Sequence, residues 1–483
     1  MAYESLREFV DFLERRDELT RVSVEVDPIY EITEIADRAV KHNGPALLFE
    51  RVKDSPFPLL INGYASTRRM NWALGVEDLD EHVRRIEELI KIQVPEGLVD
   101  KLRQLPRLFD LTKYLPKTVS SGACQQVVYE GDEVDLGILP AMKCWPEDGG
   151  RYITLPIVFT VDRETGRRNA GTYRMQILDK NQTAMHWQIH HGGAEHLRGY
   201  EAAGETMEVA VALGGDPALA YAATAPMPPG IDEMLLASFL RQRPVEMVDC
   251  VTVDLQVPAC ADFVLEGMIR PGERTVEGPF GDHTGHYSLA DEYPVFHVTA
   301  LTHRKDPIYP STIVGKPPME DACLAKATER LFLPLMQMIM PEVVDINLPI
   351  AGIFTNWIIV SIDKRYPFHA KKVMNAIWGT GQLSLIKFVV VVDKRVNVHD
   401  LDEVIWRIGN NVDPGRDIMF VEGPRDVLDF SGNLPFAGVK MGIDATRPWP
   451  EEGYTGEWPD EIVMSEEIKE LVDRRWTEYG ISL

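Results

Sequence analysis

Two carboxylates lie five residues apart in the segment Glu277-Gly-Pro-Phe-Gly-Asp282. The segment is too rich in glycine and proline to form a helix, and Pro279 stiffens it, so it is predicted to be a rigid loop. Two carboxylates held close together cannot both ionise without a free-energy cost, so one of them can keep a proton at neutral pH. The loop is therefore a candidate general acid, although a solvated surface turn has the same composition.

A second candidate lies in the segment Asn169-Ala-Gly-Thr-Tyr-Arg174-Met-Gln176. If this segment is a strand, its two-residue repeat places Thr172, Arg174 and Gln176 on one face. The guanidinium of Arg174 matches the oxygens of a carboxylate or phosphate, so this face is a candidate anion-binding surface. A strand that only exposes polar side chains to water has the same pattern.

Histidines are concentrated in one short stretch. Four of the twelve lie within eleven residues: His186, His190, His191 and His196. Their spacing matches no familiar zinc motif, so a metal site, phosphate contacts and structural roles all stay open. Glu233 follows a proline-rich stretch and begins a predicted helix, where a glutamate acts as a helix cap or as a ligand for a hard metal ion.

The composition is that of a globular protein of two or three domains, with 483 residues, 45% of them apolar. The formal net charge of −25 argues against nucleic-acid binding and limits membrane contact to a peripheral one. An anionic ligand would need a local cationic or metal site. The five cysteines are widely spaced and no targeting segment is visible, which predicts reduced thiols in a cytoplasmic protein.

Three regions differ in their patterns, and we expect an N-terminal α/β region (1–118), a β-rich domain (119–318) and a C-terminal α/β domain (319–483). The first region predicts helices at 6–13 and 79–92 and strands at 46–49 and 58–61. The second predicts a strand meander, closed as a barrel or sandwich and interrupted by one helix, with strands at 157–161, 172–177, 183–189, 251–257, 262–269 and 295–303 and the helix at 231–241. The third predicts strands at 357–362, 385–392 and 417–421, helices at 367–378 and 402–408, the latter ending at Gly409, and a final helix at 466–476 that could pack on a neighbour.

Taken together, these motifs resemble the UbiD family of reversible decarboxylases, which use prenylated FMN, and within it the 3-polyprenyl-4-hydroxybenzoate decarboxylase branch. The resemblance covers nearly the whole chain. Its most specific segments are Cys144-Trp-Pro-Glu-Asp148, Arg274-Thr-Val-Glu277-Gly-Pro-Phe-Gly-Asp282-His-Thr-Gly285, Gly315-Lys-Pro-Pro318 and Lys440-Met-Gly-Ile-Asp-Ala-Thr446.

The resemblance implies a split β-barrel like that of flavin reductases for the middle domain, and homodimers or homohexamers built through the C-terminal domain. It also implies prenylated FMN supplied by a flavin prenyltransferase, a divalent metal (Mn²⁺ or Mg²⁺) on the flavin phosphate, and a nearby K⁺. The metal ligands map onto Asn169, Glu233 and His191, with His190 as an alternative. The cofactor-binding residues map onto Asn169, Thr172, Tyr173, Arg174, His186, Trp187, Gln188, His191, Gly192 and Glu233.

In the same resemblance, the catalytic triad maps onto Glu277, Arg174 and Asp282. Asp282 is expected to return the proton that replaces CO₂, with its pKa raised by burial and by Glu277 and lowered by Arg174. An aspartate at 282, followed by His283, resembles the branch that acts on phenolic acids in quinone biosynthesis, of polyprenyl-hydroxybenzoate or hydroxynaphthoate type. The alternatives are a catabolic decarboxylase or carboxylase of protocatechuate-like or α,β-unsaturated acids and, more remotely, a flavin reductase or a flavin-binding subunit.

Overall fold

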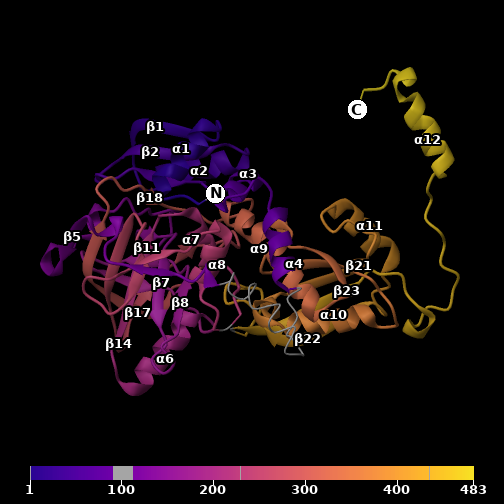
Figure 1. Ribbon diagram of the computed structural model, residues 1–483. Coiled ribbons are helices and arrows are strands. Elements are labelled where there is room, and N and C mark those ends of the chain that lie inside the picture. Colours follow the sequence, from indigo (N-terminus) through magenta and orange to yellow (C-terminus); the bar gives the residue numbers. More distant parts are fainter. Residues whose placement is uncertain (1, 91–111, 229, 435, 483) are drawn as a thin grey trace, which may run out of the picture.

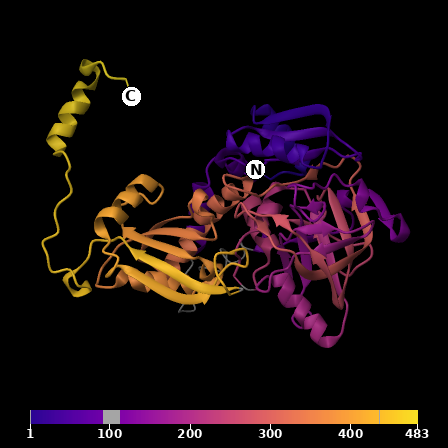
Figure 2. The same ribbon diagram turned by 180° about the vertical axis from the view of Figure 1, so that it is seen from behind.

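The computed structural model describes residues 2–90, 112–228, 230–434 and 436–482 (Figure 1). The N-terminal region lies above a large central sheet, and the C-terminal domain lies to one side of it. Figure 2 shows the same arrangement from behind, with the last helix, α12 (Glu466–Arg475), standing away from the rest of the chain. The chain therefore forms a mixed α/β fold of several domains.

The N-terminal region is a four-stranded sheet flanked by helices. The order β1–β2–β3–β18 joins strands β1 (Leu19–Val26), β2 (Ala46–Val52), β3 (Leu59–Ile61) and β18 (Tyr309–Pro310). Successive residues of β2 point to opposite faces: Leu47 packs in the cluster that contains helix α2 (Glu31–Lys41), and Leu48 in the one that contains α1 (Leu6–Arg15). Helix α3 (Thr67–Ala73) follows. The predicted helix at 79–92 is confirmed as α4 (Asp80–Ile90), and residues 91 and 92 of the prediction lie outside the described residues.

The central region is dominated by an antiparallel sheet. Among the described residues the sheet has nine strands, with the order β6–β9–β10–β17–β14–β11–β7–β8 and β5 paired to β17. The strands are β5 (Val127–Glu130), β6 (Tyr152–Ile153), β7 (Ile157–Val161), β8 (Arg168–Gly171), β9 (Met175–Ile177), β10 (Gln182–Met185), β11 (Met207–Leu213), β14 (Phe263–Glu277) and β17 (Asp291–His303). No pairing joins the end strands β6 and β8 within the described chain. The split barrel therefore stays a prediction.

Two predicted strands of this region are shorter than expected. The chain leaves the sheet between β8 and β9, because the Thr172 amide hydrogen-bonds the Ala223 carbonyl instead of a neighbouring strand. The strand predicted at 183–189 ends at Met185. The two-residue repeat that we expected to place Thr172 and Arg174 on a strand face is therefore wrong, and both residues lie in an irregular segment.

The strand predicted at 251–257 was also misplaced. The ordered part is β13 (Gln256–Pro258), which pairs with β12 (Glu246–Asp249), which in turn pairs with β4 (Lys117–Val119). Residues 251–254 bend instead, because the amides of Val251 and Thr252 donate to the buried Glu266 carboxylate at 2.9 and 2.6 Å.

More helices interrupt the central region than the one we expected. Besides α8 (Glu233–Arg241), the region contains α6 (Gly192–Ala203) and α7 (Pro217–Ala222). The long helix α9 (Glu320–Ile339) then leads into the C-terminal domain. Pro334 lies inside α9.

The C-terminal domain is the expected α/β layer. Its sheet has the order β19–β20–β21–β23–β22 and comprises β19 (Val343–Asn347), β20 (Trp357–Ile362), β21 (Phe388–Asp393), β22 (Ile418–Pro424) and β23 (Ala437–Asp444). Helix α10 (His369–Trp378) covers one face, and α11 (Leu401–Asn411) packs on the other. Helix α11 runs through Gly409, so the helix end predicted there is wrong.

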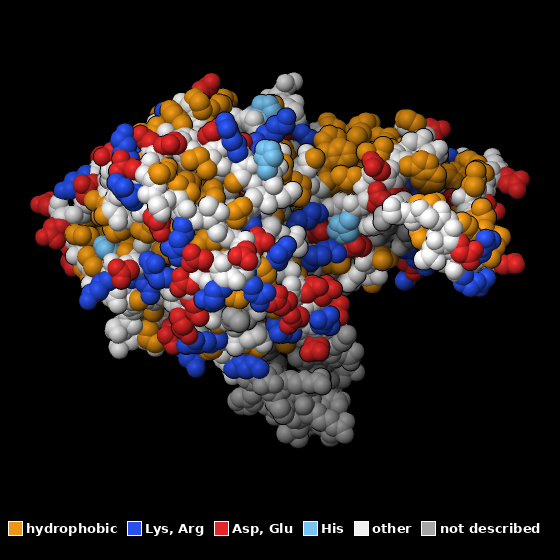
Figure 3. Space-filling view, turned by 90° about the horizontal axis from the view of Figure 1, so that it is seen from above, with side chains coloured by type: hydrophobic (Ala, Val, Ile, Leu, Met, Phe, Trp, Pro, Cys, Tyr) orange, Lys and Arg blue, Asp and Glu red, His pale blue; other side chains and the backbone are white. Residues whose placement is uncertain are grey.

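The side of the molecule seen in Figure 3 carries charges of both signs. Lys and Arg side chains are interspersed with Asp and Glu on the side seen in Figure 3, and hydrophobic side chains gather over the C-terminal domain. In the part of the chain that the structure describes, no helix combines the length and the apolar character needed to cross a bilayer.

Candidate active site

The loop that carries the candidate catalytic acids, residues 277–288, is called the catalytic loop below and begins where β14 ends. It contains the short hairpin of β15 (Phe280–Gly281) and β16 (Tyr287–Ser288). Glu277 is the last residue of β14 and is fully buried, and Asp282 follows β15 with 3% of its surface exposed. The loop is non-helical, as predicted, and it meets Arg174 through Glu277, Asp282 and Ser288.

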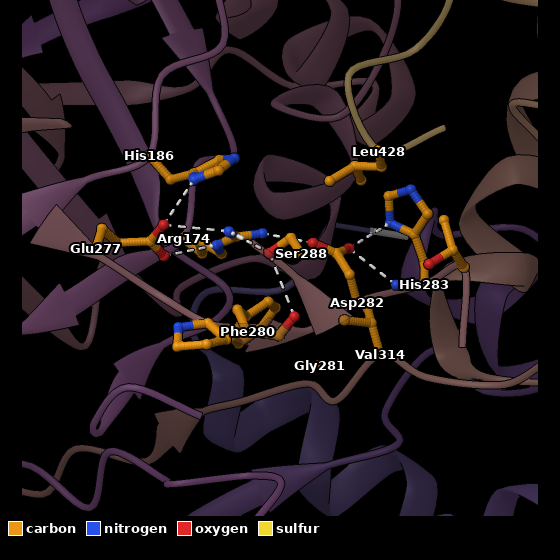
Figure 4. Close-up of polar contacts among 12 residues, drawn as sticks. Arg174, His186, Glu277, Phe280, Gly281, Asp282, His283, Ser288, Val314 and Leu428 are labelled. Carbon is orange, nitrogen blue, oxygen red and sulfur yellow. Dashed lines mark hydrogen bonds and ion pairs between the residues drawn. The ribbon is translucent and has the colours of Figure 1, made fainter. Parts of the chain in front are cut away.

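Arg174 lies between the two carboxylates and bonds both (Figure 4). Its Nε and Nη2 atoms donate to the two oxygens of Glu277 at 2.9 and 3.2 Å, and Nη1 donates to Asp282 Oδ2 at 2.5 Å. Nη2 also donates to Ser288 Oγ at 2.9 Å, and the guanidinium lies 4.4 Å from the centre of the Phe280 ring. These bonds occupy four of the five N–H donors of the arginine, which leaves one, on Nη1, for a ligand.

His186 extends this cluster on the side of Glu277. Its Nδ1 atom lies 3.0 Å from Glu277 Oε2, and its ring packs 4.4 Å from the ring of Tyr293 on β17. Burial lowers the pKa of His186, and the charge of Arg174 lowers it further. The imidazole is therefore neutral near pH 7, and Nδ1 donates its hydrogen to the carboxylate.

The charges around the loop correct our expectation that one of its two acids keeps a proton. Burial alone would raise the pKa of Glu277, but the hydrogen bond from His186 and the charge of Arg174 outweigh it and lower the pKa to about 2. Burial would likewise raise the pKa of Asp282, but the charges of His283 and Arg174 outweigh it and lower that pKa. Both acids are ionised at rest, because one arginine compensates them together.

The buried Asp148 carboxylate connects the catalytic loop to the segment 144–148 through backbone hydrogen bonds. Asp148 accepts from the amides of Cys144 and Trp145 through Oδ2 at 3.0 and 2.8 Å, and from Gly281 through Oδ1 at 2.8 Å. The segment 144–148, quoted above as part of the family resemblance, thus acts as a brace for residue 281. The sequence alone did not indicate a role for Asp148.

Side chains and backbone atoms on the sheet side complete this support. Gln176 accepts from the Gly278 amide at 2.8 Å, and the Tyr152 hydroxyl donates to the Pro279 carbonyl at 3.2 Å. Gly278 has a φ of 94°, and a Cβ at Gly281 would lie 2.1 Å from the Trp145 ring. The glycines of the loop are therefore needed for its backbone shape and for close packing.

The residues assigned to a metal and a flavin phosphate form a second group, beside the start of α6. Asn169 Nδ2 lies 3.4 Å from the Tyr173 hydroxyl, and the His191 ring lies 4.8 Å from the Tyr173 ring. A Cβ at Gly192 would lie 2.2 Å from Asn169 Oδ1, so these two residues are in close contact. His190 is exposed, and its ring lies 4.9 Å from that of His191.

Glu233 joins this group through the backbone, because its Oε2 atom accepts from the Ala170 amide at 3.0 Å. Burial raises the pKa of Glu233 to about 7, and the opposing charge of Arg168 is too small to reverse it. Within the described residues no three His, Cys, Asp or Glu side chains are arranged as a metal site. The set that the family resemblance implies takes one ligand from an asparagine instead. The carboxylate, amide and imidazole atoms of this set suit Mn²⁺ or Mg²⁺.

Several polar atoms between the two groups have no hydrogen-bond partner among the described residues. They are Thr172 Oγ1, His186 Nε2 and Trp187 Nε1, all buried. Buried polar groups without partners are rare in folded proteins, so a polar ligand between Arg174 and Glu233 would satisfy them. The residues present therefore fit a flavin cofactor. Gln188 lies beside them, and its backbone N–H donates to His191 Nδ1 at 3.1 Å.

The C-terminal domain closes the site from the opposite side. Leu428 points toward Asp282 and His283 in Figure 4, and the rings of Phe354 and Phe430 lie 5.3 and 4.5 Å from those of His283 and His286. Next to the site, a cavity of about 240 Å³ is lined from both domains, by residues that include Trp187, Gln188, Tyr293, Val427 and Phe436. Sequence patterns gave no signal for these contacts, which depend on how the domains pack.

Known proteins resemble this chain over its full length. The models of the 3-octaprenyl-4-hydroxybenzoate carboxy-lyase family match residues 10–90 (N-terminal domain), 117–317 (Rift-related domain) and 322–445 (C-terminal domain). The chain belongs to the UbiD family of carboxy-lyases. It is 53% identical to an uncharacterized protein of Archaeoglobus fulgidus over 480 residues, which is 99% of each chain.

Solved structures agree with this assignment. The closed form of vanillic acid decarboxylase from Sedimentibacter hydroxybenzoicus has a TM-score of 0.87 with 29% identity, covering 100% of both chains, and its open form has a TM-score of 0.78. The UbiD-class enzyme HmfF from Pelotomaculum thermopropionicum, solved in complex with FMN, has a TM-score of 0.79 with 31% identity over 97% of this chain and 99% of that one. Another structure of HmfF contains prenylated FMN.

Proposed function

We propose that this carboxy-lyase uses prenylated FMN to decarboxylate a phenolic aromatic acid. The observation that carries the proposal is the cluster in which Arg174 bonds both Glu277 and Asp282 beside buried polar atoms without partners. The flavin complexes of HmfF and the reaction named for vanillic acid decarboxylase support it. When bound, the modified flavin supplies an electron sink for the carbanion that loss of CO₂ would leave.

The protein's own residues have separate tasks in this proposal. The remaining N–H of Arg174 binds the substrate carboxylate, while Glu277 and Ser288 fix the plane of the guanidinium. Asp282 bonds Nη1 of Arg174, whereas Glu277 bonds Nε and Nη2. Asp282 transfers a proton to the carbon that has lost CO₂. Leu428 and Phe354 exclude water from this step by covering the loop.

The second group holds the cofactor. Asn169, His191 and Glu233 would hold a divalent ion, Mn²⁺ or Mg²⁺, whose charge would balance that of the flavin phosphate, with K⁺ as a second ion. The middle domain would form a split barrel around the flavin. The first turn of α6, with Gly192 at its start, offers backbone N–H groups that favour an anion. The cofactor comes from a partner flavin prenyltransferase, and the enzyme assembles as a homodimer or homohexamer through its C-terminal domain.

Two substrate types fit the proposal. One is a polyprenyl-hydroxybenzoate or hydroxynaphthoate of quinone biosynthesis. The likeness to vanillic acid decarboxylase favours the other, a small hydroxybenzoate such as vanillate or protocatechuate.

The first experiment is the absorption spectrum and mass of the cofactor released after co-expression with a flavin prenyltransferase. We expect prenylated FMN with one Mn²⁺ per chain, and then CO₂ release from phenolic acids in a screen that includes vanillate, 3,4-dihydroxybenzoate and a prenylated 4-hydroxybenzoate. A folded protein that binds no flavin under these conditions would contradict the proposal.

A further inference from the structure

The role proposed for Asp282 raises the question of where its proton comes from. Arg174 Nη1, the His283 amide and His283 Nδ1 contact its two oxygens at 2.5, 2.8 and 3.1 Å. Three donors around one carboxylate keep it ionised, and its pKa lies below the ordinary value for the same reason. A carboxylate that is ionised at rest needs a proton from a neighbour before it can act as an acid.

Only one of the three donors can give up a proton. The guanidinium of Arg174 does not deprotonate in proteins, and a backbone amide is far too weak an acid. The imidazole of His283 is the remaining group, because an imidazolium can release a ring proton. Because Nδ1 faces the lone pairs of a carboxylate, this nitrogen carries the hydrogen.

Two acids interact with the His283 imidazole. Asp282 contacts one side of the ring, and Asp321 lies in the first turn of α9. Burial raises the pKa of Asp321 to about 6, the charge of His283 lowers it and the charge of Asp282 raises it, so the three groups are electrostatically coupled. Arg174 is the opposing cation, and the Phe354 ring covers another side of the imidazole. His283 Nε2 is buried and has no hydrogen-bond partner among the described residues.

We propose that His283 is a proton store: it enters the closed site as an imidazolium and passes its Nδ1 proton to Asp282 once in each turnover. This inference rests on the decarboxylation proposed above. The His283 N–H bond breaks as the Asp282 O–H bond forms, and that O–H bond then breaks as the new C–H bond takes the electron pair left by CO₂. Neutral imidazole keeps the hydrogen on Nε2 and regains a proton from water when the product leaves, so each turnover consumes one proton.

The first test measures the charge of His283 without any turnover. The full chain, labelled with ¹⁵N-histidine and free of cofactor, is titrated by NMR, and the His283 signals are identified by their loss in His283→Gln. We expect both ring nitrogens to carry hydrogen at pH 7, and Asp321→Asn to lower the titration midpoint by about 0.5 to 1 pH unit. A His283 that is neutral at pH 6 in the wild type would overturn the proposal.

The second test uses the enzyme loaded with prenylated FMN. His283→Gln should lower kcat about 10²- to 10⁴-fold with little change in KM, and wild-type kcat should fall as pH rises through the NMR midpoint. His286→Gln is the matched control, because the His286 side chain contacts Thr284 and Phe430, and only its backbone carbonyl bonds Asp282. A wild-type kcat in His283→Gln would refute the proposal that His283 supplies the proton to Asp282. Wild type that releases no CO₂ from any acid would refute the proposed function, and the NMR titration would still decide the state of His283.

Discussion

Buried carboxylates have pKa values shifted in opposite directions in the catalytic loop and in the group around Glu233. Glu277 and Asp282 share Arg174, and both pKa values are lowered although the side chains are buried. Glu233 is bonded to the Ala170 amide, and burial raises its pKa to about 7. The difference is the presence or absence of a fixed cation at bonding distance.

This difference indicates two kinds of site. A cluster that is compensated within the protein is complete before a ligand arrives, and can orient a substrate through the one donor that is left over. A buried carboxylate without adequate compensation is stabilised when a metal ion binds, which suits a group that holds a cofactor phosphate. The contrast therefore supports the proposal of a preorganised reaction centre and, next to it, a site that an ion would complete.

The largest effect should come from removing the shared cation. Arg174→Ala leaves Glu277 and Asp282 buried without a counter-charge, which should destabilise the fold by about 3–5 kcal/mol and abolish turnover. Urea unfolding followed by circular dichroism measures the first effect and CO₂ release the second. The matched control is Arg163→Ala, which breaks an exposed ion pair with Glu205 and should change neither.

The difference in stability between the wild type and Arg174→Ala should depend on pH. A carboxylate whose pKa is lowered by folding adds stability above its unfolded pKa, about 4.5 for Glu277, and loses it as the pH falls toward about 2. The stability gap between the wild type and Arg174→Ala should therefore be full at pH 7 and shrink between pH 5 and pH 2. A gap that does not change with pH would mean that the arginine stabilises the fold by packing alone.

Asp282→Asn should be the next largest change, and should affect activity much more than folding. The amide keeps an oxygen for Arg174 but cannot donate a proton to carbon, so kcat should fall about 10³- to 10⁴-fold. Cofactor content, measured by the spectrum of the purified protein, should be unchanged because the proposed flavin contacts lie elsewhere. Turnover at the wild-type rate would remove Asp282 from the reaction.

The sequence predicted much of the catalytic cluster for reasons that can be traced to individual residues. Glycine and proline between Glu277 and Asp282 limited the loop to a rigid turn, and the structure brings both acids to Arg174 as the family resemblance implied. The strand repeat used for Arg174 was nevertheless wrong, because the Ala223 carbonyl draws the chain out of the sheet. The residue types could be identified from sequence, whereas the local backbone depended on a distant partner.

The parts that sequence could not predict depend on packing between distant segments. Asp148 supports Gly281 across 133 positions, and Phe354 reaches His283 from another domain. The ionisation of Asp282 was also out of reach, because burial and Arg174 act in opposite directions and only their distances decide the balance. Helix α6 was missed because its first turn follows a run of histidines and glycines with no helical repeat of apolar residues.

Glu233→Gln tests the ion-dependent site. The amide removes the negative charge, so Mn²⁺ should raise the thermal midpoint of the cofactor-free wild type, but not that of the variant. Without metal the variant should be at least as stable as the wild type at pH 8, because a buried charge has been removed. The matched control is Glu195→Gln, an exposed acid in the first turn of α6, which should keep the full response to Mn²⁺.

The smallest effect should come from the brace behind the catalytic loop. In Asp148→Asn one of the oxygens that accept the Cys144, Trp145 and Gly281 amides becomes a donor, so at least one of these bonds is lost. The loop should shift by a fraction of an ångström, and kcat should fall about 10-fold with KM and cofactor content nearly unchanged, because Asp148 touches neither ligand. Asp162→Asn, at an exposed turn, is the control. If Asp148→Asn lowered cofactor content as strongly as kcat, the brace would be positioning the flavin group as well, and the two sites would be less independent than their opposite pKa shifts suggest.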